Sequence, residues 1–518
     1  MTTVLDGLTL AAVLAATVVG GLRWLRVSQR EHYLPGRATR ILRLWLSLSP
    51  IDMALAVTAL VLALAAFVPI LGVLAIPSAA LAAFLPRGLG IHGRTSRLAW
   101  TGRLRRLAAA WAVIVLVLLT VLGLLLGPGP TTLVALTVPL TVDLAAIVMG
   151  VVEKRLSAPF VAKAQQRLAR VRPTVVAITG SYGKTSTKGY VAHLLAMSRG
   201  VVASPASFNN RLGLSRAVND GLVEGTEVFV AEMGTYGPGE IRELCELFPP
   251  DIAVITTIGE AHLERMGSRE TILAAKSEIT ERAQIVVLPI DDEGLRALAD
   301  RCRAEGKRVV TCSVRTADTE ALEADVVVDL VAQEAVVEQN GRAHTLHLGE
   351  GIAHGVNLGV ALGVALALDV EVATLESRLA ALPRAAHRAE VQDTGTGLLV
   401  IDDTYNANPI GSHAALAEAA QLARSRGGRL VLVTPGMVEL GHVQHRRNAD
   451  FGAEAAALDV HVVVVGRTNR AALVEGVHSG GGSLDVVDRR DQAVAVATQV
   501  VGSEGVILYE NDLPDHYP

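Results

Sequence analysis

The chain has 518 residues, of which 51% are hydrophobic, and its formal net charge is −4. That length is enough for about three domains. The small net charge averages a basic front over an acidic remainder and gives no reason to expect a nucleic-acid partner. Three cysteines (Cys245, Cys302 and Cys312) have a spacing that fits neither a disulfide framework nor a zinc site. We therefore expect free thiols in a reducing cytoplasm.

Four long apolar segments fall within the first 150 residues. Leu8–Leu22 has no basic segment before it, so we interpret it as a retained membrane span and not as a cleaved signal. Ala54–Leu85 would form about 48 Å of helix, which is too long for one crossing of a ~30 Å core and short for two. Leu107–Leu126 and Thr131–Gly150 have the length of single spans.

Basic clusters alternate with these segments. Six arginines lie between Arg23 and Arg43, six more between Arg87 and Arg106, and a third basic stretch runs from Lys154 to Arg172. The positive-inside rule places all three in the cytoplasm, so an even number of spans separates each neighbouring pair. We therefore predict five spans with the N-terminus outside, in which Ala54–Leu85 is a re-entrant or tight hairpin. The alternative is four spans, with one basic loop on the wrong side.

Asp143 lies within the last apolar segment. A carboxylate inside a membrane is a candidate functional group by default. Near a helix interface it can also serve simply as a hydrogen-bond acceptor. The sequence alone assigns it no role.

Beyond the apolar segments, a glycine-rich loop separates a strand predicted at Thr174–Ile178 from a helix predicted at Thr187–Met197. Such a loop surrounds an anion with backbone N–H groups and a helix N-terminus. Its GxxGKT spacing is shorter than the common GxxxxGK[ST] pattern. Lys184 would reach the β- and γ-phosphates of a nucleotide, and the Thr185 hydroxyl would hold Mg²⁺. The predicted nucleotide-binding residues of this loop are Gly180, Ser181, Gly183, Lys184, Thr185 and Ser186.

Lysine is rare in this chain, since only six of the 47 basic residues are Lys. Wherever a positive charge alone is needed, the sequence mostly uses Arg. Lys184, Lys188 and Lys276 therefore require an explanation. An ammonium is a compact point charge that can also act as a nucleophilic amine, and a guanidinium cannot replace it in that role.

After the loop, apolar β-branched runs alternate with helical segments, which is typical of a parallel sheet with helical crossovers. A second alternating block begins near Arg388 and has no phosphate loop of its own. We therefore expect two α/β domains that share one nucleotide bound between them. The predicted strands after the loop are Glu227–Met233, Asp251–Ile258, Ile285–Ile290, Arg308–Cys312, Leu398–Asp402, Leu430–Thr434, Val460–Val465 and Gly505–Tyr509.

Two polar residues follow predicted strands at the edge where open α/β sheets bind ligands. Glu232 ends the strand Val228–Ala231, and a carboxylate beside a phosphate loop is better interpreted as a Mg²⁺ ligand than as a solvated strand end. His262 follows the next strand. A single histidine is more often structural, but this position favours a second metal or phosphate contact.

Seven motifs, in chain order, resemble those of the Mur ligases, the ATP-dependent enzymes that build the peptidoglycan stem peptide. The closest likeness is to the member that adds D-alanyl-D-alanine. The resemblance covers about residues 173–470 and is specific as a set, although each motif alone is weak. The motifs are TGSYGKTSTK at 179–188, SFNN at 207–210 with Gly213, EMG at 232–234 with PGEI at 238–241, GEAHLERMGS at 259–268, AKSEI at 275–279, DDTYNANP at 402–409 and MVELG at 437–441.

The resemblance implies a reaction in which ATP phosphorylates a substrate carboxylate and an amine then displaces phosphate from the acyl phosphate to form an amide. Lys184 and two Mg²⁺ ions would neutralise the two anions that meet. By family likeness, Thr185 and Glu232 hold one Mg²⁺ and His262 helps to hold the other. Lys276 matches the lysine that carries a carbamate in many family members, which would turn an amine into a carboxylate-like metal ligand. The alternative for Lys276 is an ordinary helix-surface residue.

The family also implies the domain order and further contacts. We expect an α-helical membrane domain at 1–172, a central ATP-binding α/β domain of the P-loop type at 173–383, and a Rossmann-like C-terminal domain at 384–518. Asn357 matches the second Asn of the segment that contacts the adenine, Arg388 matches a linker arginine that touches ATP phosphates when the last domain closes, and Asp403 is a plausible ribose contact. Lys184, Lys276, His262 and Arg388 form the expected catalytic set. The expected substrate contacts are Asn209, Asn210, Tyr405, Asn406 and Asn408.

Both substrate-recognition ends of the chain depart from the family pattern. The apolar segments stand where the family has a soluble domain that holds the UDP-sugar. Tyr509-Glu510-Asn511 stands where the D-alanyl-D-alanine-adding member has KGS, Pro289 stands where Asn is usual, and His354 replaces the first Asn of the adenine segment. Amide ligation is therefore predicted more firmly than either substrate.

Three functions fit these observations. The first is a membrane-anchored Mur-type ligase that adds an amino acid or dipeptide to a UDP- or lipid-linked peptidoglycan precursor, with its ligase domains in the cytoplasm and membrane lipid as a partner. The second is a membrane-bound synthetase of the poly-γ-glutamate type. The third is a non-catalytic scaffold that only binds nucleotide, which the set Lys184, Thr185, Glu232, His262 and Lys276 disfavours.

Overall fold

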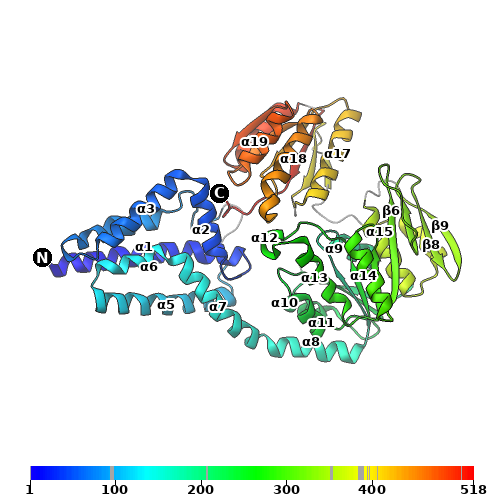
Figure 1. Ribbon diagram of the computed structural model, residues 1–518, viewed down its shortest axis with the longest axis horizontal. Coiled ribbons are helices and arrows are strands. Elements are labelled where there is room, and N and C mark those ends of the chain that lie inside the picture. Colours follow the sequence, from blue (N-terminus) through cyan, green and yellow to red (C-terminus); the bar gives the residue numbers. More distant parts are fainter. Residues whose placement is uncertain are drawn as a thin grey trace.

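The computed structural model describes residues 2–93, 98–205, 208–349, 354–382, 390–393, 395, 397–404, 407–502 and 504–518. Figure 1 shows three parts in chain order. A group of helices forms one side of the molecule, and two α/β domains form the other. The C-terminal end of the chain lies between the helices and the last α/β domain.

The helical domain contains eight α-helices and two short 3₁₀ segments among its described residues. By length and composition, two helices could cross a bilayer, or up to four if each sharply bent pair counts as one span. The predicted number of five spans stays a prediction. The helices are α1 (Thr2–Arg30), α2 (Arg37–Leu48), α3 (Pro50–Ala65), α4 (Ala75–Phe84), α5 (Gly102–Leu126), α6 (Thr132–Leu136), α7 (Val138–Leu156) and α8 (Ala158–Val171), with η1 (Pro69–Leu74) and η2 (Gly129–Thr131).

The long apolar segment after α2 forms a helical hairpin. Helices α3 and α4 pack against each other, and Ser78 donates a hydrogen bond to the Ala59 carbonyl at 2.7 Å. Helix α3 has 16 residues, about 24 Å at ~1.5 Å per residue, which is less than a ~30 Å hydrocarbon core. The hairpin returns at Arg87, which is paired with buried Asp52 at 2.7 Å. This geometry fits the re-entrant form of the predicted hairpin.

Asp143 of α7 lies at the N-terminus of α2. Its carboxylate accepts hydrogen bonds from the backbone N–H groups of Ala38 (3.1 Å) and Thr39 (2.9 Å), and from the Thr39 hydroxyl (2.6 Å). The first N–H groups of a helix have no partner within the helix, and a carboxylate there also interacts favourably with the helix dipole. The Asp143 carboxylate therefore fixes the start of α2 to α7.

The central domain is a nine-stranded sheet between two layers of helices. Its strand order is β2-β3-β1-β4-β5-β6-β7-β8-β9, parallel from β2 to β7 and antiparallel at the β7–β9 edge. Apolar residues of α8, α10, α11, α13 and α14 cover one face, and those of α9, α15 and α16 cover the other. The elements are β1 (Thr174–Thr179), α9 (Lys184–Leu195), β2 (Val201–Ala203), α10 (Arg211–Gly221), β3 (Val228–Glu232), α11 (Glu240–Leu247), β4 (Ile252–Ile255), α12 (Leu263–Met266), α13 (Arg269–Ser277), β5 (Ile285–Pro289), α14 (Glu293–Ala304), β6 (Arg308–Arg315), β7 (Val326–Asp329), β8 (Glu334–Gln339), β9 (Arg342–His347), α15 (Gly355–Ala367) and α16 (Glu376–Leu379), with η3 (Glu278–Thr280) and η4 (Val372–Thr374).

The C-terminal domain is a six-stranded sheet in the order β10-β11-β15-β12-β13-β14, antiparallel only between β10 and β11. Residues of α17 and α18 pack with α19 on one face, and α20 covers the other. The elements are β10 (Glu390–Asp393), β11 (Leu399–Asp403), α17 (Pro409–Ser425), β12 (Leu430–Thr434), η5 (Gly441–Val443), α18 (Gln444–Ala457), β13 (His461–Val465), α19 (Arg470–Ser479), β14 (Leu484–Val487), α20 (Arg490–Val501) and β15 (Val506–Glu510).

The predicted strands are present as parallel strands, one prediction needs correction, and one feature was missed. The helix after the phosphate loop begins at Lys184 and not at Thr187, because Gly183 in the left-handed conformation ends the loop directly before it. The antiparallel edge β7–β9 was not predicted. Its β8–β9 turn is Asn340-Gly341, with both residues at positive φ, and this pair is a recognised hairpin signal.

Candidate functional site

Two glycines shape the phosphate loop between β1 and α9. Gly180 (φ 154°) lies so close to the segment after β4 that a Cβ there would be 1.9 Å from a threonine hydroxyl. Gly183 (φ 78°) approaches Asn357, where a Cβ would be 2.1 Å from Oδ1. Only glycine fits both the backbone conformation and the space. The Ser181 hydroxyl accepts a hydrogen bond from Gly259 N at 2.9 Å, so this side chain fixes the loop to the segment after β4.

The predicted phosphate and metal residues of the loop face the end of β3. Lys184 Nζ donates to the Gly180 carbonyl at 2.6 Å, so the ammonium lies over its own loop. Thr185 Oγ1 donates to Glu232 Oε2 at 3.1 Å. Strands β1 and β3 are adjacent and parallel, with Ile178 opposite Glu232. Their carboxyl ends therefore bring the loop and the carboxylate together.

Glu232 also has a cationic partner that the sequence singled out without a role. Lys188 Nζ lies 2.8 Å from Glu232 Oε2, and both side chains are almost fully buried. Burial alone would raise the pKa of Glu232, but the Lys188 ammonium outweighs it and lowers that pKa below its ordinary value. Asn209 Nδ2 donates to the other carboxylate oxygen at 3.4 Å. The carboxylate is therefore ionised and oriented toward the loop.

Lys276 lies in the last turn of α13 and is almost fully buried, 1% exposed. Burial lowers its pKa well below the ordinary value, and the nearby Lys184 charge lowers it further. This excludes the helix-surface alternative. A lowered pKa favours the neutral amine form of a lysine side chain.

His262 is held by a residue of the C-terminal domain. Its Nδ1 lies 2.8 Å from Glu439 Oε2, and Arg265 also binds the Glu439 carboxylate. Burial lowers the pKa of His262 despite this carboxylate. Burial by itself would raise the pKa of Glu439, but the hydrogen bond from His262 and the charge of Arg265 hold it well below its usual range. A neutral imidazole that bonds an ionised carboxylate through Nδ1–H leaves Nε2 as an acceptor.

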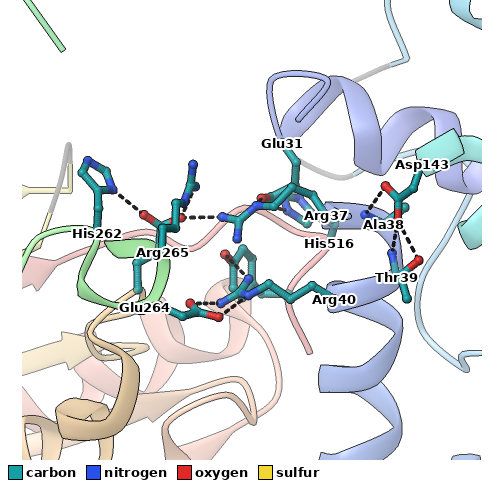
Figure 2. A network of polar contacts seen from close by, with 12 residues as sticks. Glu31, Arg37, Ala38, Thr39, Arg40, Asp143, His262, Glu264, Arg265 and His516 are labelled. Atoms are coloured by element: carbon teal, nitrogen blue, oxygen red, sulfur yellow. Dashed lines mark hydrogen bonds and ion pairs between the residues drawn. The ribbon is translucent and has the colours of Figure 1, made fainter. Parts of the chain in front are cut away.

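Figure 2 shows that this pair belongs to a junction of all three domains. Arg37 of α2 lies 2.6 Å from Glu439 and 2.6 Å from Glu31. Arg40, one turn further along α2, is paired with Glu264 of the central domain. The helical domain therefore contacts both α/β domains beside His262, through arginines that the sequence analysis assigned only to a cytoplasmic basic cluster.

The segment after β15 completes this junction from the C-terminal side. Asp515 is paired with Arg26 at 2.8 Å. Buried His516 bonds Glu31 through Nε2 at 2.9 Å, and its carbonyl accepts from Trp45 Nε1 at 2.9 Å. The C-terminal segment therefore ties the last α/β domain to α1 and α2.

The structure gives several predicted binding residues a local role. Asn210 Oδ1 accepts from Gly213 N at the start of α10, and Asn408 Oδ1 accepts from Gly411 N at the start of α17, so both cap helices. Asn357 Oδ1 accepts from the Thr187 hydroxyl at 3.3 Å.

Asp403, the last residue of β11, is half-buried, and its carbonyl accepts from Asn511 N. Its ribose contact and the substrate contacts of Asn209, Asn210 and Asn408 stay predictions. Arg388, Tyr405 and Asn406 lie outside the described residues.

The donor set fits Mg²⁺ with a nucleotide and not a metal site made by protein alone. The described residues contain no group of three His, Cys, Asp or Glu side chains that could hold a metal ion. Mg²⁺ at nucleotide sites typically takes one or two protein ligands, with phosphate oxygens and waters. The adjacent Thr185 hydroxyl and Glu232 carboxylate match that need.

A cavity of about 970 Å³ lies between the helical and C-terminal domains. It lies along the carboxyl ends of β12, β13 and β15, the edge at which open α/β sheets bind ligands. Its walls carry both signs of charge, including Arg26 and Arg87 from the helical domain and Asp488 and Asp512 from the C-terminal domain. The phosphate loop does not line it.

Comparison with known proteins gives two family matches. Residues 178–365 match the Mur ligase middle domain, and residues 387–509 match the Mur ligase glutamate ligase domain. Neither match reaches the helical domain.

Among curated proteins, the chain is 34% identical over 352 residues to UDP-N-acetylmuramoyl-tripeptide--D-alanyl-D-alanine ligase of Mycobacterium leprae, covering 62% of this chain and 67% of that one. It is 32% identical to the Bacillus subtilis enzyme of the same name, covering 56% and 62%. For the Mycobacterium tuberculosis enzyme the identity is 35%, and the match spans only 60% of its length.

Solved structures give the same result. MurF from Acinetobacter baumannii aligns with a TM-score of 0.56 and 25% identity, covering 68% of this chain and 77% of that one. MurF from Thermotoga maritima in complex with ADP aligns with a TM-score of 0.56 and 26% identity, covering 68% and 80%.

Proposed function

The chain belongs to the Mur ligase family, and we propose that it is an ATP-dependent ligase that forms an amide bond on a peptidoglycan precursor at the cytoplasmic face of a membrane. The observation that carries the proposal is the set of Lys184, Thr185, Glu232, His262 and Lys276 around one phosphate loop, in the family's middle domain. A scaffold that only bound nucleotide would need neither the buried amine of Lys276 nor the contact between His262 and Glu439 of the C-terminal domain.

The reaction begins with transfer of the γ-phosphoryl group to a substrate carboxylate, which releases ADP and gives an acyl phosphate. The amine nitrogen of the second substrate then attacks the carbonyl carbon, phosphate leaves, and the amine loses a proton. Lys184 lies at the loop where it would neutralise the phosphates. Thr185 and Glu232 would hold Mg²⁺, which offsets the repulsion between the two anions.

We propose that Lys276 carries a carbamate and that His262 helps to hold a second Mg²⁺. CO₂ reacts only with a neutral amine, and burial shifts Lys276 toward that form. The product, an N-carboxylate, is a hard oxygen ligand of the kind that Mg²⁺ prefers. The remaining predicted contacts of Asn357, Arg388 and Asp403 with ATP belong to the same proposal.

The membrane location is supported by the helical domain. Its apolar helices α1 and α5 are long enough to cross a bilayer. The basic residues at the end of α1 and α7 lie on the side of the ligase domains. The positive-inside rule places that side in the cytoplasm.

Neither substrate is fixed by the relatives. Their names specify a UDP-N-acetylmuramoyl-tripeptide and D-alanyl-D-alanine. In this chain a helical domain precedes the matched region, and Glu510 follows Tyr509 in place of a KGS motif. We propose a carboxylate on a UDP- or lipid-linked precursor and an amino acid or dipeptide as the amine, with the cavity of about 970 Å³ holding the part of a substrate that does not react.

The test uses the full chain in detergent or lipid nanodiscs with ATP and Mg²⁺. UDP-linked, lipid-linked and free γ-glutamyl acceptors are combined with candidate amines, and phosphate release and product mass are measured. Amide formation on a cell-wall precursor is expected. Amide formation only with polymeric glutamate would replace this proposal by the poly-γ-glutamate type, and no turnover with any pair would leave the nucleotide-binding scaffold.

A further inference from the structure

One arginine of the helical domain is part of the contact network of the predicted reaction centre. Arg37 opens α2 and is almost fully buried, with its side chain 9% exposed. Its Nη2 donates to Glu439 Oε1 at 2.6 Å, and its Nε donates to Glu31 Oε2 at 2.6 Å. The guanidinium thus joins a residue of its own domain to one in the C-terminal domain (Figure 2).

Glu439 connects Arg37 to His262. Its second carboxylate oxygen, Oε2, lies 2.8 Å from His262 Nδ1. Its backbone carbonyl accepts from Glu264 N at 3.1 Å. Two atoms of one residue therefore bind the short segment that carries His262.

Both partners of this contact have unusual backbones. His262 has φ 62° and Glu439 has φ 65°, in the left-handed region that non-glycine residues rarely adopt. Such residues persist where surrounding contacts hold them. Two strained residues that face each other across a domain boundary indicate that function requires the geometry of this contact.

Contacts near both ends of helix α2 also fix its position. Asp143 of α7 binds its first N–H groups, and Trp45 near its other end binds the His516 carbonyl. The position of Arg37 is therefore set in part by α7 and by the C-terminal segment, besides its direct contact with Glu439.

We infer that Arg37 is a positioning residue for the reaction. It orients the Glu439 carboxylate, which in turn fixes the His262 ring through Nδ1 and leaves Nε2 as the acceptor for a metal ion. This inference rests on the proposed function through the role of His262. It makes the helical domain a working part of the ligase site, since an outer partner that orients a metal-binding histidine is nearly as important as the ligand itself.

The chemistry of this position requires arginine. Two acceptors must be bound in different directions by one rigid planar group, which a guanidinium provides and an ammonium on a flexible stem does not. The substitution Arg37→Lys would keep the charge, but the new side chain could not hold both Glu31 and Glu439 in the observed geometry.

The test compares Arg37→Gln with Arg43→Gln in the full chain in nanodiscs. Arg43 lies on the same helix but is exposed, so it is a matched control for loss of one charge from α2. The measurement is the Mg²⁺ dependence of equilibrium binding of a fluorescent ATP analogue, with melting temperature recorded for each variant. Arg37→Gln is expected to weaken the apparent Mg²⁺ affinity about tenfold, and Arg43→Gln is expected to leave it unchanged.

Two further variants separate positioning from folding. Glu439→Gln should weaken Mg²⁺-dependent binding at least as much as Arg37→Gln, and the double variant should be no worse than Glu439→Gln alone, because both act through one contact. Arg37→Lys should have a melting temperature close to that of the wild type. Its Mg²⁺ affinity should stay close to that of Arg37→Gln. Additive effects, or an unchanged Mg²⁺ affinity in Arg37→Gln, would overturn the inference.

These outcomes are distinct from failure of the proposed function. A wild-type protein that binds Mg²⁺ and ATP but forms no amide would remove the proposed reaction while leaving the Arg37 comparison measurable. A wild-type protein that forms amides, with Arg37→Gln indistinguishable from Arg43→Gln, would keep the reaction and remove the inference.

Discussion

Lys188 Nζ and Glu232 Oε2 form an ion pair 2.8 Å long whose side chains are 7% and 4% exposed. The pair lies directly behind the phosphate loop, since Thr185 binds the same carboxylate oxygen. In the absence of a metal, Lys188 thus supplies the positive charge that keeps Glu232 ionised. The carboxylate is ready for Mg²⁺ without first losing a proton.

Replacing Lys188 by Met should destabilise the protein by about 3–5 kcal/mol, because it leaves a buried carboxylate without its partner. Added Mg²⁺ should then raise the melting temperature more than in the wild type, since the ion replaces the lost charge. Thermal unfolding with and without Mg²⁺ measures both effects. Arg216→Met is the control, because Arg216 belongs to an exposed pair with Asp220 and its loss should cost under about 1 kcal/mol. Equal shifts in the two variants would contradict the assignment.

Lys184→Ala should reduce phosphate release by about 100- to 1,000-fold, the usual result of removing one group that stabilises transition-state charge. Lys163→Ala on α8 removes an exposed lysine and should have no effect. Phosphate release under saturating ATP and Mg²⁺ is the measurement. Persistence of wild-type turnover in Lys184→Ala would refute the catalytic assignment of the loop.

Lys276 is expected to carry a carbamate. Incubation with ¹³C-labelled bicarbonate should give a carbamate carbonyl signal by NMR in the wild type and none in Lys276→Met. The variant should lose most phosphate release while binding ATP. If the wild type gives no such signal at neutral pH, the carbamate assignment is wrong. The low pKa of Lys276 would then have no role beyond being a consequence of burial.

The same lysine gives a prediction for stability. Without the carbamate, the pKa of Lys276 in the folded protein lies well below its ordinary value of 10.5, which the unfolded chain keeps. Folding therefore releases a proton between the lowered pKa and 10.5, and stability should rise with pH across that range. In CO₂-free buffer, Lys276→Met should melt at a higher temperature than the wild type at pH 7, and this difference should shrink toward pH 10.5.

The folding stability of the C-terminal domain should fall as pH rises, because Glu510 is buried. Burial raises the pKa of Glu510 to about 7, although hydrogen bonds from Ser412 and Thr434 oppose the shift. The folded state therefore holds a proton that the unfolded state loses above its ordinary pKa of 4.5, so stability falls as pH rises from about 4.5 to 7. Glu510→Gln should remove this decline. Parallel melting curves from pH 5 to 8 in the two proteins would contradict it.

Much of the ligase part could be predicted because its signals are local. A β-branched run, a glycine loop and a polar residue at each strand end specify a parallel sheet with ligands at one edge, and Glu232 and Thr185 do meet there. Lys276 was singled out by the rarity of lysine. The capping roles of Asn210 and Asn408 were also visible in principle, since each precedes a helix.

The junction around Arg37 could not be predicted in the same way. Its contacts join residue 37 to residue 439 and residue 31 to residue 516, and no periodicity or spacing relates such distant positions. In the sequence these arginines are explained fully by the positive-inside rule. Only packing distinguishes exposed Arg43 from buried Arg37, six residues earlier on the same helix.

The connection between α7 and α8 sets how the ligase would meet its substrates. The chain keeps a helical backbone through Ser157, and α8 is bound to the central domain by Arg167, which donates to the carbonyls of Leu222 (2.6 Å) and Asn219 (2.7 Å). With the helical domain in a bilayer, as proposed, this link would keep the nucleotide loop at a fixed height above the membrane surface. A lipid-borne substrate would arrive by lateral diffusion in two dimensions, so its conversion rate would depend on its surface density in the vesicle and not on its bulk concentration.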